Sequence, residues 1–401
     1  MADLFDKITN DPVLLAARMG REQGIYPYFK PLSETEGTEV VIDGHRLIMI
    51  GSNNYLGLTT HPRVRRAAME AIERYGTSCT GSRFLNGTLE LHKELERRLA
   101  RFLGKEAALI FGTGYQANLG AITALMGKDD IAIADREIHA SLVDAIRMAG
   151  CQMKRFRHND MNDLERVLKE CGDVPKMIIV DGVYSMGGDL AALPEIVTLA
   201  KRYGARLFVD DAHGLGVMGE GGRGTHFHFD CVDDVDLIMG TFSKSFASLG
   251  GVVAGDRDVI DYIQHHARSL IFSASMPPAN VATVLACLDV IEENPSYVQQ
   301  VHVQSAKVRD GLRRMGYDCG QSVTPIVPVF IKNEMHTVFT WKALFDNGVY
   351  TNPVLPPAVP PSKSLLRTSY MATHTDEQIE TVLKVFEHVG QLTGLLQPVV
   401  A

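Results

Sequence analysis

From about residue 89 onward, segments with helical periodicity alternate with short apolar segments typical of buried strands. Leu91, Leu95, Leu99 and Phe102 recur at helical spacing before Gly104, which indicates an amphipathic helix over 89–103 that ends at a glycine. Such alternation is typical of an α/β fold with a mostly parallel central sheet and helices on both faces, because parallel strands need crossover connections. We expect strands over 108–111, 131–134, 177–180, 207–210, 237–240 and 251–254.

The pattern changes after about residue 290, where longer helices and a proline-rich stretch replace the regular alternation. A chain of 401 residues has room for two or three domains. We therefore predict an N-terminal segment over 1–60, a large domain over 61–290 and a smaller α/β C-terminal domain over 291–401. The smaller domain is expected to contain a helix over 294–315, a strand over 325–331, a proline-rich connection over 352–361 and a last helix over 376–393.

Charge and hydropathy exclude several classes of partner. The chain has 40 basic and 48 acidic residues and a net charge of -8, without a basic stripe, so we expect no nucleic-acid binding. The longest apolar runs, such as 177–180, are far shorter than the roughly 20 residues of a transmembrane helix, and the N-terminus lacks the pattern of a signal peptide. We expect a cytoplasmic protein and leave open a peripheral contact with a membrane.

Cysteine and histidine spacing predicts neither a disulfide framework nor a metal site. The six cysteines include no CxxC pair, as expected for a chain in a reducing compartment. His226 with His228, and His265 with His266, have no neighbouring cysteines or carboxylates at metal-ligand spacing. We therefore predict that no metal is bound.

An acid, an imidazole and a lysine follow two predicted strands. The strand over 206–209 leads into Asp210 and His213, and the strand over 237–240 leads into Lys244. In open α/β sheets, ligands bind at the carboxyl ends of the strands. A lysine in a partly desolvated site can lose its proton and form a Schiff base. An aspartate nearby can keep a pyridinium nitrogen protonated, which makes pyridoxal phosphate an electron sink.

Two further strand ends carry candidate residues. Gly112 and Gly114 lie where a strand leads into a helix, so backbone amides there could hold a phosphate. A turn of this kind is by itself also an ordinary strand-to-helix connection. His139, at the next strand end, fits a helix cap, a surface residue or a side chain stacked on a cofactor ring.

Taken together and in order, these motifs resemble the α-oxoamine synthase family of pyridoxal phosphate enzymes, of fold type I. Segments over nearly the whole chain resemble this family, and within it the bacterial serine palmitoyltransferase branch. Other branches usually have Gly-Lys-Ala around the lysine, where this chain has Ser243-Lys244-Ser245. The family motifs are FGTGYQAN, DREIHAS, DGVYSMGGD, VDDAHGLG, GTFSKSFASLGG, FSASMPP and LLRTSYMATHT, and the branch segments include GSNNYLGLT, GSRFLNGTLELH and RHNDMNDL.

The resemblance implies a reaction and a role for each matching residue. The reaction is condensation of L-serine with a long-chain acyl-CoA, palmitoyl-CoA, to 3-ketosphinganine by a homodimer with shared active sites. Lys244 would carry pyridoxal 5′-phosphate and remove the Cα proton, Asp210 would pair with the pyridinium nitrogen and His139 would stack on the ring. The other implied contacts are His213 and Ser185 to the ring hydroxyl, Gly114, Tyr115, Thr241 and one of Ser273 and Ser275 of the partner subunit to the phosphate, and Asn54, Tyr55 and Arg367 to the amino acid.

Three other functions share part of this pattern. An aminotransferase would also use Lys244 and Asp210. An 8-amino-7-oxononanoate synthase, or another α-oxoamine synthase, would take glycine or alanine and a shorter acyl-CoA. A catalytically inactive regulatory subunit is disfavoured because Lys244, Asp210, His213 and His139 are all present.

Overall fold

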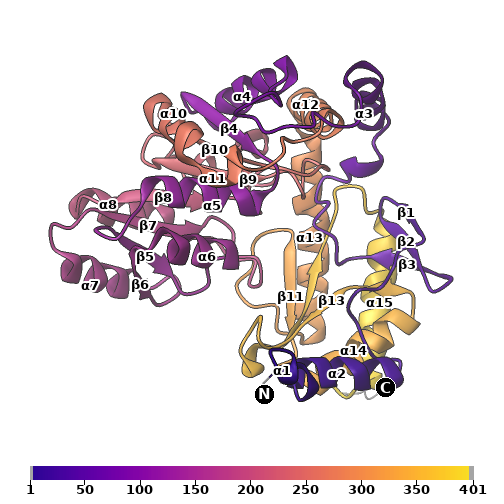
Figure 1. The fold of residues 1–401 in the computed structure, drawn as a ribbon. Helices are drawn as coiled ribbons and strands as arrows, with labels where there is room; N and C mark the ends of the chain where they lie inside the picture. The colour runs from indigo at the N-terminus through magenta and orange to yellow at the C-terminus, as the bar shows by residue number, and fades with distance from the viewer. Residues whose placement is uncertain (1–2, 397–401) are drawn as a thin grey trace.

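A seven-stranded sheet lies at the centre of the larger part of the molecule (Figure 1). The computed structural model describes residues 3–396. The strand order is β4-β10-β9-β8-β7-β5-β6, and β10 runs antiparallel to both of its neighbours. The other neighbouring pairs are parallel, which confirms the predicted mostly parallel sheet. The strands are β4 (Ala107–Phe111), β5 (Ile131–Asp135), β6 (Gln152–Phe156), β7 (Lys176–Asp181), β8 (Arg206–Asp210), β9 (Leu237–Thr241) and β10 (Gly251–Gly255).

Alternate side chains of the central strands enter two separate cores. In β7, Ile178 belongs to one core and Ile179 to the other. Successive strand side chains point to opposite faces, so a sheet covered on both sides has continuously apolar strands. One face is covered by α5 (Gly114–Leu125), α6 (Ala140–Ala149) and α10 (Arg257–His266), and the other by α4 (Glu90–Leu103), α7 (Met161–Cys171), α8 (Leu193–Arg202) and α12 (Pro278–Glu293).

The edge strand β6 is absent from the strands that the sequence predicts. Gln152 is exposed, and only Phe156 of this strand is fully buried. An edge strand buries little of its surface, so its composition, QMKRF, lacks the apolar run by which the central strands are recognised.

The C-terminal part has its own core, to which residues near the N-terminus contribute. Val40 and Leu47 are buried in the same core as Trp341 and Leu366. The strands at 39–49 therefore pack with the C-terminal part, and the divisions at 1–60, 61–290 and 291–401 stay predictions. One sheet contains β1 (Glu34–Glu36), β2 (Glu39–Ile42), β3 (His45–Met49) and β12 (Val349–Tyr350), and the other contains β11 (Ile326–Phe330), β14 (Leu365–Ser369) and β13 (Asn352–Val354).

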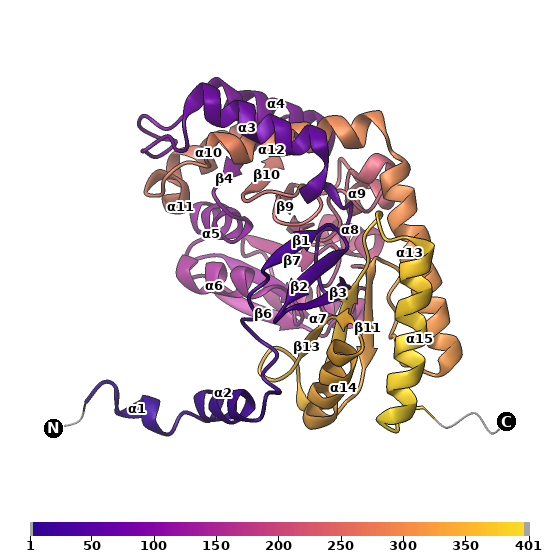
Figure 2. The same ribbon diagram turned by 90° about the vertical axis from the view of Figure 1, so that its right-hand side faces the viewer.

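A long helix, α13 (Ser296–Met315), joins the two parts of the molecule. Val301 is buried in the core of the larger part, whereas Val308 is buried in that of the smaller part. Figure 2 shows α13 beside the last helix, with the first two helices leading away from the body of the molecule. Within residues 3–396, no helix is long and apolar enough to cross a membrane. The remaining helices are α1 (Asp6–Thr9), α2 (Pro12–Glu22), α3 (Pro62–Tyr75), α9 (Thr225–His228), α11 (Arg268–Ile271), α14 (Glu334–Asp346) and α15 (Asp376–Leu392), with 3-10 turns at Leu58–Thr60, Glu220–Gly222 and Pro361–Lys363.

The first turn of α5 lies directly against the sheet because β10 begins with a glycine. A Cβ atom on Gly251 would lie 2.7 Å from the Cα and 2.9 Å from the backbone nitrogen of Gly114. Both of these atoms belong to the backbone and cannot move aside as a flexible side chain would. Gly251 therefore sets how closely the start of α5 approaches the sheet.

Replacing Gly251 by alanine is expected to destabilise the protein by about 1–3 kcal/mol, the usual cost of overpacking. The matched control is Gly127→Ala, since a Cβ at Gly127 meets no described atom within 4 Å. Urea denaturation of both variants measures the difference. Equal midpoints for the two variants would show that α5 can move away from β10 without cost.

Candidate active site

A cavity of about 270 Å³ opens at the carboxyl ends of the central strands. It collects residues from β7, β8 and β9 and from the turns after β4 and β5. The sequence-predicted residues that line it are Gly114, Tyr115, His139, Asp210, His213, Thr241 and Lys244.

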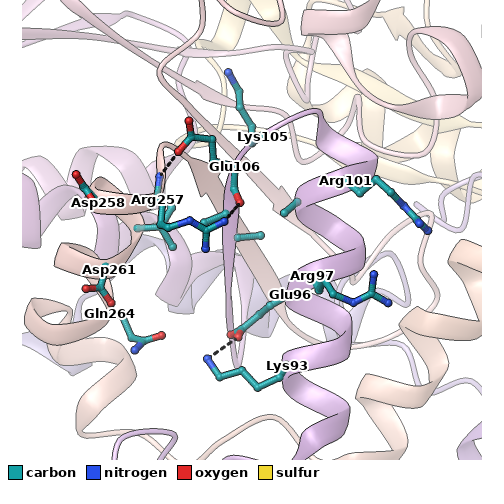
Figure 3. Close-up of a pocket in the computed structure, with 14 residues that line it drawn as sticks. Lys93, Glu96, Arg97, Arg101, Lys105, Glu106, Arg257, Asp258, Asp261 and Gln264 are labelled. Atoms are coloured by element: carbon teal, nitrogen blue, oxygen red, sulfur yellow. Dashed lines mark hydrogen bonds and ion pairs between the residues drawn. The ribbon is translucent and has the colours of Figure 1, made fainter.

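A larger cavity, of about 690 Å³, lies between α4 and α10 at the start of the edge strand β4 (Figure 3). Its charged side chains pair with neighbouring protein groups. Lys93 Nζ lies 3.0 Å from Glu96 Oε2, and the backbone nitrogen of Arg257 donates to Glu106 Oε2 at 3.2 Å. Because this groove is at the amino end of β4, the carboxyl-end cavity is the better candidate for a catalytic site.

Asp210, the last residue of β8, presents a fixed carboxylate to the cavity. Its Oδ2 accepts a hydrogen bond from Asn118 Nδ2 at 2.7 Å, and its Oδ1 accepts one from the backbone nitrogen of Ala212 at 3.1 Å. Asn118 also donates to Ser141 Oγ at 2.8 Å. The sequence analysis assigned no role to Asn118, although it lies one helical turn after Gly114 on α5 and so faces the same site.

Lys244 follows β9 and directs its amine into the cavity. Desolvation, together with the positive charge of Arg367, lowers the pKa of this amine to about 7 against the opposing attraction of Asp210 and Asp181. Half of the amine is therefore neutral near pH 7, in contrast with an exposed lysine. A neutral amine is the form that attacks an aldehyde.

His139 caps the N-terminus of α6 and leaves its ring exposed toward the cavity. Its Nδ1 lies 2.7 Å from Ser141 Oγ, and its backbone nitrogen donates to Asp181 Oδ1 at 3.2 Å. Asp181, which the sequence analysis did not single out, is the last residue of β7 and pairs in register with Asp210. Burial, with the neighbouring Asp210 charge, raises the pKa of Asp181 well above its usual value.

The start of α5 forms an anion cradle. The side chain of Thr113 accepts a hydrogen bond from the backbone nitrogen of Gln116, which leaves the amides of Gly114 and Tyr115 in the first turn, where helices bind anions. Thr241 Oγ1 lies 3.0 Å from Ser243 Oγ on the other side of the cavity. A Cβ on Gly114 would lie 2.9 Å from that Thr241 oxygen, so the space above the helix depends on glycine.

A chain of contacts leads from the cavity to the C-terminal part. Tyr55 Oη lies 2.7 Å from His213 Nδ1 and accepts a hydrogen bond from Arg367 Nη2 at 3.4 Å. Arg367 Nε donates to the backbone oxygen of Ser185 at 2.7 Å. Asn54 is buried, with its Oδ1 unpaired within the described residues. Burial, together with the charges of Lys244 and Arg367, lowers the pKa of His213 well below its usual value, so its imidazole is neutral.

Six of the predicted residues do not line the cavity: Asn54, Tyr55 and Arg367, described above, and the serines at 185, 273 and 275. Ser185 contributes its backbone oxygen to Arg367, as described above. Ser273 Oγ accepts a hydrogen bond from Gln116 Nε2 at 3.1 Å, near the start of α5. Ser275 Oγ donates to the backbone oxygen of Gly81 at 3.1 Å. Within one chain, the Ser273 hydroxyl therefore lies near the anion cradle, the Ser275 hydroxyl lies beside Gly81, and none of the three serines lines the cavity.

The donor set fits pyridoxal phosphate. A helix start with neighbouring hydroxyls suits a phosphate, a fixed carboxylate suits a pyridinium nitrogen, and a lysine with a lowered pKa suits an aldehyde. Because Gly114 has no side chain, there is space at the start of the helix. The unpaired Oδ1 of Asn54 is an unused hydrogen-bond acceptor.

Comparisons with known proteins agree with this chemistry. The family described as aminotransferase class I and II matches residues 45–386. A serine palmitoyltransferase of Bacteriovorax stolpii is 51% identical over 382 residues, 95% of this chain and 91% of its own length. An 8-amino-7-oxononanoate synthase of Geobacter sulfurreducens is 43% identical over 379 residues, 94% of this chain and 97% of its own length.

Solved structures give the same assignment. A serine palmitoyltransferase from S. paucimobilis with a bound PLP–myriocin aldimine has a TM-score of 0.95 and 36% identity, covering 98% of this chain and 100% of that one. The architecture is accordingly that of fold-type I pyridoxal phosphate enzymes. The chain therefore belongs to the aminotransferase class I and II family, as a pyridoxal phosphate enzyme of the α-oxoamine synthase group.

Proposed function

We propose that this enzyme condenses L-serine with palmitoyl-CoA to 3-ketosphinganine, coenzyme A and carbon dioxide, the first step of sphingolipid synthesis. The observation that most supports this choice is the 51% identity with a serine palmitoyltransferase along nearly the whole chain. The site supports the chemistry, because a lysine, an aspartate and a histidine meet in one cavity beside an anion cradle.

The cofactor would be held at five points. Gly114, Tyr115 and Thr241 would bind its phosphate, and Lys244 would bind its aldehyde carbon. Asp210 pairs with the ring nitrogen, and Asn118 and the Ala212 amide keep this carboxylate in place. The other ring contacts would be His139 on one face and His213 at the ring hydroxyl, whereas the expected Ser185 contact stays a prediction because Ser185 does not line the cavity. Pyridoxal phosphate, when bound, withdraws electrons from the substrate Cα and so acidifies its proton.

Lys244 then serves as the base for the serine Cα proton. Its lowered pKa of about 7 leaves a large share of the amine neutral at physiological pH and able to accept that proton. His139, at the N-terminus of α6, would restrict how the substrate lies beside the cofactor ring.

Arg367 binds the serine carboxylate, with Asn54 and Tyr55 beside it. The guanidinium is held by Ser185 and Tyr55 through Nε and Nη2, which fixes the plane of its fork. A planar guanidinium is suited to a carboxylate because it can donate two parallel hydrogen bonds.

The enzyme would act as a homodimer, with Ser273 or Ser275 of the partner subunit reaching the phosphate. The segment that carries these serines lies near the start of α5, and it includes Phe272, which is 72% exposed. The neighbouring Leu85 is 78% exposed, so a partner subunit would cover apolar surface here. Light scattering tests the assembly, and a fully active monomer would contradict it.

An 8-amino-7-oxononanoate synthase is the second candidate, supported by the 43% identity with such a protein from Geobacter sulfurreducens. Both reactions would use Lys244, Asp210, His139 and His213 in the same way. They differ in the amino acid and in the acyl chain. An inactive regulatory subunit is disfavoured because these four residues line one cavity.

Apoenzyme is expected to bind pyridoxal phosphate faster as the pH rises through about 7, because the neutral Lys244 amine is the reactive form. Stopped-flow absorbance in the visible region measures the rate. Borohydride reduction should then attach the cofactor covalently to Lys244 of the wild-type protein. In the Lys244→Ala variant, no residue should be labelled. The control is Lys169→Ala, which removes an exposed lysine. Labelling of another lysine, or a rate that rises only near pH 10, would contradict the assignment.

Substitution of Arg367 by lysine keeps the charge but loses the planar fork, and serine affinity is expected to fall about tenfold or more. Visible absorbance titration of holoenzyme with serine measures the affinity, while cofactor content should stay unchanged. Arg309→Lys is the control, since Arg309 is also partly buried but donates to the backbone oxygen of Thr324. An unchanged serine titration in Arg367→Lys would remove this residue from the substrate site.

Serine with palmitoyl-CoA is expected to exceed alanine with pimeloyl-CoA by at least about a hundredfold in kcat/KM, or roughly 2.7 kcal/mol. Each buried methylene contributes about 0.8 kcal/mol, whereas the terminal carboxylate of pimeloyl-CoA would have to enter an apolar channel. The test measures coenzyme A release and product mass for each combination of the two amino acids and the two thioesters. The preferred pair identifies the substrates. Efficient turnover of alanine and pimeloyl-CoA alone would move the chain to the 8-amino-7-oxononanoate synthases and leave the cofactor assignments standing.

A further inference from the structure

A half-buried histidine bridges two carboxylates behind the candidate active site. His158 follows β6, and its Nδ1 lies 3.0 Å from Asp135 Oδ1 while its Nε2 lies 2.9 Å from Asp189 Oδ2. Its ring meets the ring of Tyr184 edge-on, with centroids 4.4 Å apart and an interplanar angle of 89°. His158 has no role among the predictions from the sequence and none in the proposed mechanism.

The geometry requires a charged imidazole. Both ring nitrogens face carboxylate oxygens, which accept hydrogen bonds, so each nitrogen must carry a proton. Burial by itself would lower the pKa of His158, but the hydrogen bonds to Asp135 and Asp189 and the nearby charge of Glu137 raise it to about 10. His158 therefore supplies a positive charge to an acidic cluster.

Asp135 links this charge to the loop that ends at His139. Asp135 is fully buried at the end of β5. Its Oδ1 accepts a hydrogen bond from the backbone nitrogen of Glu137 at 2.8 Å, and its Oδ2 accepts one from that of Asn159 at 2.9 Å. The carboxylate thus holds the loop over residues 135–139 from inside.

The same loop has two further attachments. Its far end is tied to the sheet, where Asp181 accepts the backbone hydrogen bond of His139. Its outer side is tied to the C-terminal part, where Lys363 Nζ lies 2.7 Å from Glu137 Oε1. His158 Nε2 also lies 3.9 Å from Glu137 Oε2. One imidazolium therefore faces two carboxylates of the loop, those of Asp135 and Glu137.

We propose that His158 is a positioning residue, which acts through Asp135 to fix the loop that places the His139 ring over the cofactor. This inference rests on the proposed stacking of His139 on the cofactor ring. Loss of the charge leaves Asp135 with its two backbone donors and Asp189 with Asn159, but with no cation between the two carboxylates. Because neighbouring carboxylates without a cation repel each other, the loop over residues 135–139 must shift to separate them, and His139 moves with it.

The test uses holoenzyme with a full complement of pyridoxal phosphate and follows the visible circular dichroism of the bound cofactor. This signal reports how protein groups are arranged around the ring, and a change in general stability does not alter it. His158→Gln is expected to lower the signal per bound cofactor at least twofold, as His139→Ala does. It should lower kcat about tenfold or more and change the serine KM less than threefold, since Arg367 is not disturbed.

Two further variants make the test specific. His336→Gln is the matched control, because His336, on α14, is also partly buried and its Nε2 donates to a single backbone oxygen, that of Thr393, at 2.8 Å. It should keep the wild-type signal. Asp135→Asn removes the same link from its other side, and the double variant should lose no more than either single variant, because both changes break one chain of contacts.

The outcomes separate this inference from the proposed function. If His139→Ala leaves the signal unchanged, the proposed stacking of His139 is wrong. If His139→Ala lowers the signal but His158→Gln retains it with wild-type kcat, the positioning role is wrong. Should His158→Gln fail to fold, Asp135→Asn decides in the same way, and additive losses in the double variant would also overturn the proposal.

Discussion

The site depends on how the protein accommodates carboxylates buried at the ends of adjacent strands. Asp210, Asp181 and Asp135 close β8, β7 and β5, three neighbours in the sheet, and all are at most 4% exposed. Unpaired charges so close together would be strongly destabilising. Each carboxylate is instead held by backbone or side-chain donors, and two basic side chains, Lys244 and His158, lie at opposite ends of the group.

This charge balance connects stability to reactivity. The protein surroundings that lower the pKa of Lys244 to about 7 also raise that of Asp181, so an amine and an acid within one cavity both titrate outside their ordinary ranges. Such shifts gather at functional sites because neutral amines and protonated acids are useful in proton transfer. The price in stability is offset by the two apolar cores, which enclose the sheet on both faces.

Packing of the two parts of the chain completes the site. Arg367 lies on β14, opposite Asn352 of β13, and its guanidinium reaches Ser185 and Tyr55. The proline-rich stretch predicted as a rigid connection supplies β13, which holds the Arg367 strand in register. The Arg367 side chain is thereby oriented by residues 182 and 312 positions away in the chain.

The sequence by itself determined the central strands, the amphipathic helices and the chemical character of the strand-end motifs, since these follow from local periodicity and from residue types at strand ends. It did not reveal β6, whose polar composition is that of an edge, nor the joining of β3 with β12, which depends on contacts between distant segments. Asn118, Asp181 and His158 acquire a role only when strand order brings their donors and acceptors together. Hydrogen-bond partners across a sheet are set by tertiary packing, because nothing in the local sequence of one strand identifies its neighbour.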